Sequence, residues 1–209
     1  MKKHRSNKRW LQEHHADTYV RQARQEGYRS RAAYKLMEID RRDRLLRPDM
    51  TVVDLGAAPG GWSQVAAQRV GPKGVVIALD VLDMEPVAGV RFIRGDFRDQ
   101  PAVEALHERL GAAAVDLVIS DMAPNISGME DIDQPRSLYL AELALDFARK
   151  VLRPGGDMLV KVFQGSGTDA FTRELRASFA KVVVRKPQSS RARSREIYLL
   201  GGGFKAGPK

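Results

Sequence analysis

Charged residues lie at or near the ends of four short apolar segments in the middle of the chain. Asp80 follows "VVIAL", Asp96 follows "RFIRG", Asp121 follows "LVIS", and Lys161 lies within "MLVKVF". Apolar runs of this length are typical of buried parallel strands, and open parallel sheets bind ligands at the carboxyl ends of their strands. A single polar strand end is ordinary, but four at one sheet edge predict a ligand-binding and reactive site.

A glycine-rich loop, "GAAPGGWSQ" at residues 56–64, follows the first of these apolar segments. A triphosphate-binding loop would need lysine where Trp62 stands, and a dinucleotide fingerprint would need glycine where Ala58 stands. A loop of this kind still opens onto the start of a helix, whose free amides suit a carboxylate. We therefore predict that it binds S-adenosylmethionine, which carries a carboxylate and no phosphate.

The acidic strand ends then have natural roles in binding this cofactor. Asp80 comes 20 residues after Gly60, the spacing expected of a carboxylate that accepts hydrogen bonds from ribose hydroxyls. We expect Asp96 to accept a hydrogen bond from the adenine amine, with Phe97 available to stack on the ring. Trp62 is expected to contact the cofactor through its backbone N–H, or to fasten the start of the helix.

The methyl acceptor is constrained by which residues the chain has and lacks. There is no cysteine, which excludes cysteine-dependent methylation of a base carbon. The "DMAP" of residues 121–124 does not match the loop that commonly methylates base amines. A ribose hydroxyl is a good candidate acceptor, and this weak nucleophile needs a base or a nearby cation.

Two lysines and one glutamate are candidates for activating that hydroxyl. Lys161 has apolar neighbours, so burial would require an acidic partner or loss of its proton, whereas a strand-end lysine could also reach solvent. Lys35 flanks the apolar face of a predicted helix, and its spacing fits equally a side chain that extends to water. Glu196 is the only acid among the last 29 residues and could balance the nearby arginines or orient a lysine.

The elements that must position these residues are predicted from hydrophobic periodicity. Apolar runs indicate seven strands, at 51–56, 74–81, 90–97, 115–122, 156–163, 181–187 and 195–202. Helical patterns cover 17–26, 31–42 with Ser30 as N-cap, 61–70, 101–110, 137–152 and 168–180. The predicted class is α/β, with a mostly parallel sheet covered by helices on both faces and an antiparallel hairpin at the C-terminal end.

Charge is distributed unevenly along the 209 residues, whose net charge is +9. Residues 1–48 hold 14 Lys and Arg against 6 Asp and Glu, and residues 181–209 hold 8 against 1, whereas the middle is acidic. Two basic ends around an acidic body favour contact with a polyanion such as RNA. We predict a disordered basic arm at 1–9, a helical RNA-contacting segment at 10–50 and a catalytic region at 51–209, together forming one domain.

Other classes of site and location are disfavoured by what the sequence lacks. No metal is expected, because the histidines and carboxylates show no ligand spacing. The chain has no long apolar stretch and no signal-peptide pattern, which predicts a cytoplasmic protein without membrane contact. Two rival functions remain, a dinucleotide oxidoreductase and a non-catalytic RNA-binding assembly factor.

Six motifs in order resemble the FtsJ family of ribose methyltransferases: "SRAAYKL", "VVDLGAAPGGWSQ", "GDFRD", "SDMAPNISG", "LVKVFQG" and "SSRARSREIYL". The resemblance runs from about Arg9 to the end of the chain. It implies a Rossmann-like class I methyltransferase fold and methylation of a uridine 2′-oxygen in 23S rRNA, on the assembled 50S subunit. It also implies a catalytic tetrad of Lys35, Asp121, Lys161 and Glu196, and a cofactor set of Gly60, Trp62, Asp80, Asp96 and Asp121. We expect the protein to act as a monomer.

Overall fold

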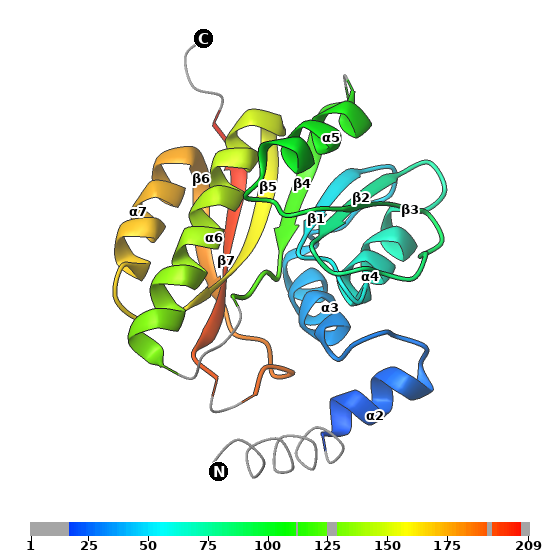
Figure 1. Ribbon diagram of the computed structural model, residues 1–209, viewed down its shortest axis with the longest axis horizontal. Coiled ribbons are helices and arrows are strands. Elements are labelled where there is room, and N and C mark those ends of the chain that lie inside the picture. The colour runs from blue at the N-terminus through cyan, green and yellow to red at the C-terminus, as the bar shows by residue number, and fades with distance from the viewer. Residues whose placement is uncertain (1–16, 112, 125–128, 192–193, 206–209) are drawn as a thin grey trace.

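Seven strands form one sheet in the order β3-β2-β1-β4-β5-β7-β6 (Figure 1). The structure is a computed structural model and describes residues 17–111, 113–124, 129–191 and 194–205. The predicted arm at 1–9 and the segment 10–16 lie outside these residues. The strands are β1 Thr51–Leu55, β2 Val75–Asp80, β3 Val90–Arg94, β4 Val115–Ser120, β5 Leu152–Phe163, β6 Phe179–Arg185 and β7 Glu196–Phe204.

Helices cover both faces of this sheet, as Figure 1 shows. One face packs against α3 (Ala32–Asp43) and α4 (Gly61–Val70), and the other against α5 (Gln100–Leu110), α6 (Glu130–Val151) and α7 (Thr168–Ser178). A short helix, α2 (Thr18–Gln25), precedes α3. The predicted α/β class with helices on both faces is confirmed.

The continuous apolar runs of the central strands follow from this two-sided burial. In β1, Val52 points into the core shared with α3 and α4, and the next residue, Val53, points into the core shared with α5, α6 and α7. Successive strand residues face opposite sides, so a strand covered on both sides needs apolar residues at every position. The position that departs from this rule, Asp54, is fully buried and belongs to the site described below.

The C-terminal hairpin inserts its second strand into the sheet. β7 runs antiparallel to both β5 and β6 and lies between them, so the predicted antiparallel hairpin is confirmed. The register pairs Lys161 with Tyr198 and Phe163 with Glu196. Residues from the end of the chain therefore lie beside Lys161 at the carboxyl edge of the parallel strands.

Some element boundaries differ from those predicted. Ser30 is not an N-cap: α3 begins at Ala32 after Arg31, which makes no capping side-chain hydrogen bond. Helix α6 begins at Glu130, seven residues earlier than expected, and continues through Pro135. A proline inside a helix removes one backbone hydrogen bond, which is why the sequence pattern alone did not extend the helix across it.

Candidate active site

The glycine loop connects β1 to α4 and is held in place by Asp80 at the end of β2. Asp80 Oδ2 accepts a hydrogen bond from the Ala58 N–H at 2.9 Å, and Oδ1 accepts one from the Leu82 N–H at 2.8 Å. Gly56 has φ +77°, and a Cβ there would lie 2.4 Å from Cγ of Met122. Any side chain at this position would therefore displace the segment that follows β4.

A cleft of about 330 Å³ opens beside this loop at the carboxyl edge of the sheet. Such a volume lies at the lower end of the range for small-molecule sites. Its walls come from the segments after β1, β2, β3 and β4 and from one side of α6, and its lining includes Gly56, Asp80, Asp96, Met122 and Tyr139. The predicted residues Asp80 and Asp96 thus face one cleft, whereas Gly60 and Trp62 do not line it.

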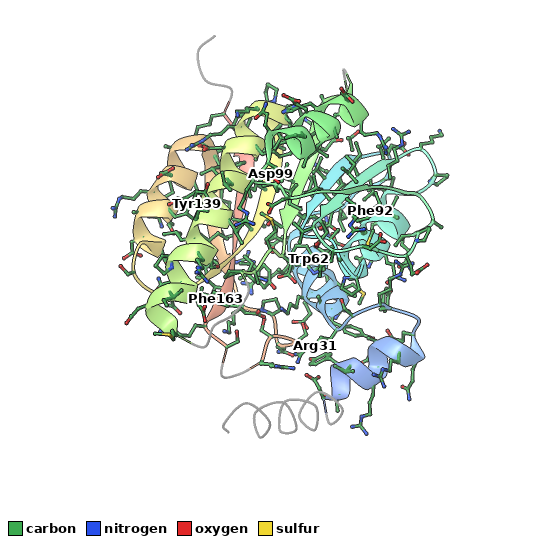
Figure 2. All side chains as sticks on the ribbon, in the orientation of Figure 1. Arg31, Trp62, Phe92, Asp99, Tyr139 and Phe163 are labelled. Carbon is green, nitrogen blue, oxygen red and sulfur yellow. The ribbon has the colours of Figure 1, made fainter. Side chains whose placement is uncertain are left out.

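Gly60 and Trp62 lie at the start of α4, on the helix side of the loop. Gly60 is the N-cap of α4 with φ +107°, a conformation that favours glycine. The Trp62 side chain is buried, and its Nε1 donates a hydrogen bond to the Ala32 carbonyl at 2.8 Å. Figure 2 shows Trp62 in the interior. Its side chain therefore fastens α3 to α4, which leaves the backbone N–H as the part expected to contact a cofactor.

Asp96 is bound on both carboxylate oxygens by Arg98. Oδ1 accepts from the Arg98 Nε at 3.0 Å, and Oδ2 accepts from Nη2 at 2.5 Å. The Arg98 side-chain hydrogen bonds lower the pKa of Asp96, against a smaller opposing effect of burial. Phe97 also lines the cleft, but its ring packs edge-to-face against Phe147 at 5.6 Å and belongs to the core.

The four residues of the predicted tetrad form two neighbouring ion pairs at the same edge. Lys161 Nζ lies 3.0 Å from Asp121 Oδ1 and donates a hydrogen bond to the Asp121 backbone carbonyl at 2.5 Å. Lys35 Nζ, from α3, lies 2.7 Å from Glu196 Oε1. Both lysines are less than 10% exposed, so neither extends to bulk water, and each has the acidic partner that burial requires.

Tyr198 joins the two pairs and was not among the predicted residues. It is fully buried on β7, and its hydroxyl donates a hydrogen bond to Asp121 Oδ1 at 2.8 Å. Its ring lies 5.6 Å from that of Trp62, with Lys35 Nζ 5.7 Å from its centroid. The alternation of strand side chains puts Tyr198 on the same face as Glu196, two residues earlier, and this was the signal that could have found it.

The ionisation of Asp121 depends on these neighbours. Burial opposes the charged form, but the positive charges of Lys161 and Lys35 and the Tyr198 hydroxyl outweigh it and lower the pKa of Asp121. Asp121 is therefore a carboxylate at neutral pH. Its side chain points toward the lysines, and the next residue, Met122, lines the cleft, so the end of β4 borders both parts of the site.

Glu196 is held by a second neighbour on the loop between β6 and β7. Ser190 donates its hydroxyl to Glu196 Oε1 at 2.8 Å, the same oxygen that Lys35 approaches. The loop itself is tied to α3 because Glu38 accepts hydrogen bonds from the backbone N–H groups of Gln188 and Ser189. The β6–β7 loop thus holds Glu196 through Ser190 and is itself held to α3, the helix that carries Lys35.

A further buried carboxyl, Asp54, lies beneath the glycine loop and was also missed. Its Oδ2 accepts a hydrogen bond from the Ser63 hydroxyl at 2.6 Å, and its Oδ1 has no partner among the described residues. Burial raises the pKa of Asp54 to about 7, opposed by the Ser63 hydrogen bond and reinforced by Asp121 and Asp80. An isolated Asp inside an apolar strand was the sequence signal.

Comparison with known proteins assigns the chain to a family. The model of the FtsJ-like methyltransferases matches residues 28–204. The chain belongs to the FtsJ-like methyltransferase family. This FtsJ-like methyltransferase is 60% identical over 203 residues to "Ribosomal RNA large subunit methyltransferase E" of Alkalilimnicola ehrlichii, covering 97% of each chain. It is 61% identical over 201 residues to the protein of the same name from Azoarcus sp., covering 96% of this chain and 98% of the relative.

A solved structure agrees with this assignment. A crystal structure described as a ribosomal RNA methyltransferase from Plasmodium falciparum superposes with a TM-score of 0.77 at 33% identity, covering 85% of this chain and 98% of the other. The Rossmann-like methyltransferase fold is therefore confirmed, and the family implies a methyl donor. Within the described ranges, no group of three or more potential metal ligands occurs and no helix is long and apolar enough to span a membrane.

Proposed function

We propose that this methyltransferase transfers a methyl group from S-adenosylmethionine to the 2′-oxygen of a uridine in 23S rRNA, on the assembled 50S subunit. The observation that carries the proposal is the buried cluster of Lys161, Asp121, Tyr198, Lys35 and Glu196 beside a small-molecule cleft. The relatives' name, a large-subunit rRNA methyltransferase, supports the choice of substrate. We also propose that the protein acts as a monomer in the cytoplasm.

The cleft residues fit S-adenosylmethionine. Gly56 lets Met122 pack closely against the loop in the cleft wall, because a Cβ at Gly56 would lie 2.4 Å from Cγ of Met122. The start of α4 offers the backbone N–H of Trp62 to a carboxylate, whereas the Gly60 N–H donates to the Ala57 carbonyl at 2.7 Å. Asp80 and Asp96 are acceptors for ribose hydroxyls and for the adenine amine, since each carboxylate oxygen can accept more than one hydrogen bond. When bound, this donor supplies a methyl group on a cationic sulfur that departs as a neutral thioether.

Lys161 is proposed to remove the proton from the acceptor hydroxyl. Its Nζ is within hydrogen-bond reach of two acceptors of Asp121, the carboxylate and the backbone carbonyl. In the ammonium form Nζ donates to both acceptors and supplies positive charge beside Asp121. After loss of one proton to solvent, its lone pair accepts the 2′-hydroxyl proton. Once it holds that proton, the ammonium directs the new N–H at the oxygen and stabilises its negative charge. Lys161 would therefore act first as the base and then, once protonated, as the group that stabilises the oxyanion.

Asp121 is proposed to hold Lys161 and to couple the two parts of the site. Its carboxylate balances the positive charge that Lys161 gains, and it remains ionised because of the surrounding cations and the Tyr198 hydroxyl. Its position directly before Met122, which lines the cleft, supports the predicted contact with the cofactor. Lys35 and Glu196 are proposed to orient the acceptor ribose from the α3 side.

The RNA is proposed to reach this edge along the basic ends of the chain. The segment at 10–50 would contact RNA phosphates, as the charge of residues 1–48 suggests, and such contacts weaken as salt is raised. In the described part of that segment, α3 is packed into the core and carries Lys35, so the RNA-contacting and catalytic parts would belong to one domain.

A methyl-transfer assay tests the proposal directly. Large-subunit particles from cells that lack this methyltransferase are incubated with the protein and S-adenosylmethionine labelled in the methyl group. We expect label in 23S rRNA at one uridine whose 3′ linkage resists alkaline hydrolysis, because a 2′-O-methyl group blocks that cleavage. Label on a base or in protein, or no transfer at all, would refute the proposed reaction.

Calorimetric titration separates the rival functions. S-adenosylmethionine should bind to the free protein and NAD should not. Tight binding of NAD alone would favour the oxidoreductase function. RNA binding without transfer of label in the methyl-transfer assay would favour a non-catalytic assembly factor.

A further inference from the structure

The end of α3 and the loop that follows it carry four arginines that pair with no acid of the described residues. Arg41, Arg42, Arg44 and Arg47, here called the arginine patch, are all exposed. None of them forms an ion pair with any residue that the structure describes. The sequence of this segment, "DRRDRLLR", alternates the two signs of charge and would suggest local pairing. The structure arranges the charges differently.

The two acids of this segment are turned inward. Asp40 is buried, accepts a hydrogen bond from the Leu46 N–H at 2.7 Å and lies 3.3 Å from Nε of Arg69. Asp43 is bound on both oxygens by Arg185, at 2.6 and 2.7 Å. Both acids therefore fasten the segment to α4 and β6, and their charges are compensated there rather than at the surface.

With Asp40 and Asp43 paired to Arg69 and Arg185, the exposed side of this segment carries a net positive charge. The exposed acid of the segment is Asp49, just after the patch, so four guanidinium groups face one carboxylate. In contrast, the lysines of the active site, Lys35 and Lys161, are each paired with an acid. The unpaired positive charges are thus those of the arginine patch, and the active-site lysines are not among them.

The patch is also separated from the tetrad. Lys35 lies in the first turn of α3, and Arg44 follows its last residue, which corresponds to about 14 Å along the axis at the rise of an α-helix. Figure 1 shows α3 between α2 and α4, beside the sheet. A strand bound in the active site would therefore need to extend along α3, or a second RNA segment would need to approach, for the patch to be contacted.

We propose that the arginine patch is a second docking surface, which binds the phosphate backbone of ribosomal RNA away from the methylated nucleotide. This inference rests on the proposed function and assigns part of the phosphate contacts of the segment 10–50 to four named residues. Guanidinium groups bind phosphate oxygens in pairs of hydrogen bonds, and such contacts position RNA without reading its sequence. None of the exposed large hydrophobic side chains among the described residues belongs to residues 41–49. The patch therefore lacks the apolar anchors that a protein interface or a membrane surface requires.

The test compares two variants with the same change of charge. In the patch variant, Arg41, Arg42, Arg44 and Arg47 are replaced by Gln. In the control variant, four other exposed arginines without ion pairs among the described residues are replaced by Gln, namely Arg91, Arg109, Arg173 and Arg176. Because all eight side chains are exposed and none is ion-paired within the described ranges, both variants should keep the thermal unfolding midpoint of the wild type.

Binding to 23S rRNA is measured over a series of salt concentrations, together with the kinetics of methyl transfer to large-subunit particles. Each phosphate contact contributes about 0.7–0.9 to the slope of log affinity against log salt. With four contacts removed, the patch variant should lose roughly 3 units of that slope and about 10- to 100-fold in affinity at low salt. Its KM for particles should rise while kcat is unchanged, since the contact is remote from the reacting atoms. The control variant should keep the wild-type slope to within one unit.

Three outcomes would overturn the inference. The first is equal loss in both variants, which would mean that only net charge matters. The second is unchanged binding to 23S rRNA with a raised KM for particles, which would indicate contact with a ribosomal protein. The third is a fall in kcat alone. Failure of the proposed function is a separate result, because it would appear as absence of methyl transfer by the wild type.

Discussion

Two adjoining regions at the carboxyl edge of the sheet are built in different ways. In the cleft, backbone N–H groups and Arg98 bind the carboxylates of Asp80 and Asp96. In the tetrad, buried side chains bind one another as Lys161–Asp121 and Lys35–Glu196. A carboxylate held by backbone N–H groups keeps its position when a neighbouring side chain is replaced. A member of a buried ion pair is instead left as an unpaired buried charge when its partner is removed.

The difference suggests a division of labour. The cleft has the features of a preformed binding site, since its acids are fixed before any ligand arrives. The tetrad is electrostatically balanced within itself, and a proton that enters or leaves one lysine changes the charge seen by every other member. Changes to cleft residues should therefore affect binding of the donor, and changes to tetrad residues should affect turnover.

Removal of the Lys161 amine is the strongest test of this division. In Lys161→Ala, and in Lys161→Met, which keeps most of the stem volume, kcat should fall by about 10²–10⁴-fold, the usual contribution of a general base. The dissociation constant for S-adenosylmethionine should stay close to that of the wild type. Single-turnover methylation and calorimetry on the same preparations measure the two effects.

The exposed residue Lys181 on β6 provides the control for that experiment. Lys181→Ala removes the same charge from the surface and should leave kcat unchanged. Near-normal turnover in both Lys161 variants would remove this amine from the chemistry.

Asp80→Asn should produce the converse result. The carboxylate accepts hydrogen bonds from the Ala58 and Leu82 N–H groups through different oxygens, and an amide can accept through only one of them. We expect the dissociation constant for S-adenosylmethionine to rise by about 10- to 100-fold, which corresponds to the loss of a charge-assisted hydrogen bond. At saturating donor, kcat should change by less than about threefold.

Asp83→Asn is the matched control, because Asp83 is largely exposed and lies 3.8 Å from Arg94. It should leave donor affinity unchanged. A large fall in kcat for Asp80→Asn at saturating donor would contradict the division between the two regions.

Asp54 gives a prediction about stability and pH. Its pKa is about 7 in the folded protein and ordinary, near 4, in the unfolded chain. Between these values the folded state holds a proton that the unfolded state has lost, so the stability that this group contributes falls as pH rises toward 7. The amide of Asp54→Asn cannot ionise, so the free energy of unfolding of this variant lacks this pH-dependent decrease.

The free energies of unfolding of wild type and Asp54→Asn are compared by urea denaturation from pH 5 to 8. The free energy of unfolding of the variant minus that of the wild type should increase by about 1.4 kcal/mol per pH unit up to about pH 7. Above that pH the difference should stay constant. A difference that is constant with pH would mean that the carboxylate is already charged at pH 5.

The sequence predicted most of the fold because each central strand must be apolar on both faces. Val52 and Val53, in two different cores, illustrate the constraint that produced the recognisable runs. Helix boundaries were less predictable where a proline lies inside a helix, as Pro135 does in α6. The start of α3 was misplaced because Ser30 has a good capping side chain but lies one residue too early.

The sequence located the site residues but not the contacts between them. The juxtaposition of Lys161 with Asp121 could be expected from adjoining strand ends. That of Lys35 with Glu196 came only from a family resemblance, because it joins the first helix of the core to the last strand. Tyr198 and Asp54 were missed since a buried tyrosine or a single acid in a strand carries no motif, and their importance appears only with their partners Asp121 and Ser63.

Tyr198→Phe should have the smallest effect of the changes considered, and it tests how the two pairs are joined. The substitution keeps the ring against Trp62 and removes only the hydrogen bond to Asp121. Because Lys161 and Lys35 still balance the Asp121 charge, we expect kcat to fall by only about fivefold, which corresponds to about 1 kcal/mol, with donor affinity unchanged.

Tyr34→Phe is its control, because the buried Tyr34 hydroxyl likewise donates to a carboxylate, that of Glu26, at 2.8 Å. Tyr34 lies on the same helix as Lys35 but has no contact with Asp121 among those that the structure describes. If both variants reduce kcat equally, the effect of Tyr198 comes from general packing around α3. If Tyr198→Phe alone reduces it, the hydroxyl acts by holding the carboxylate that Lys161 depends on.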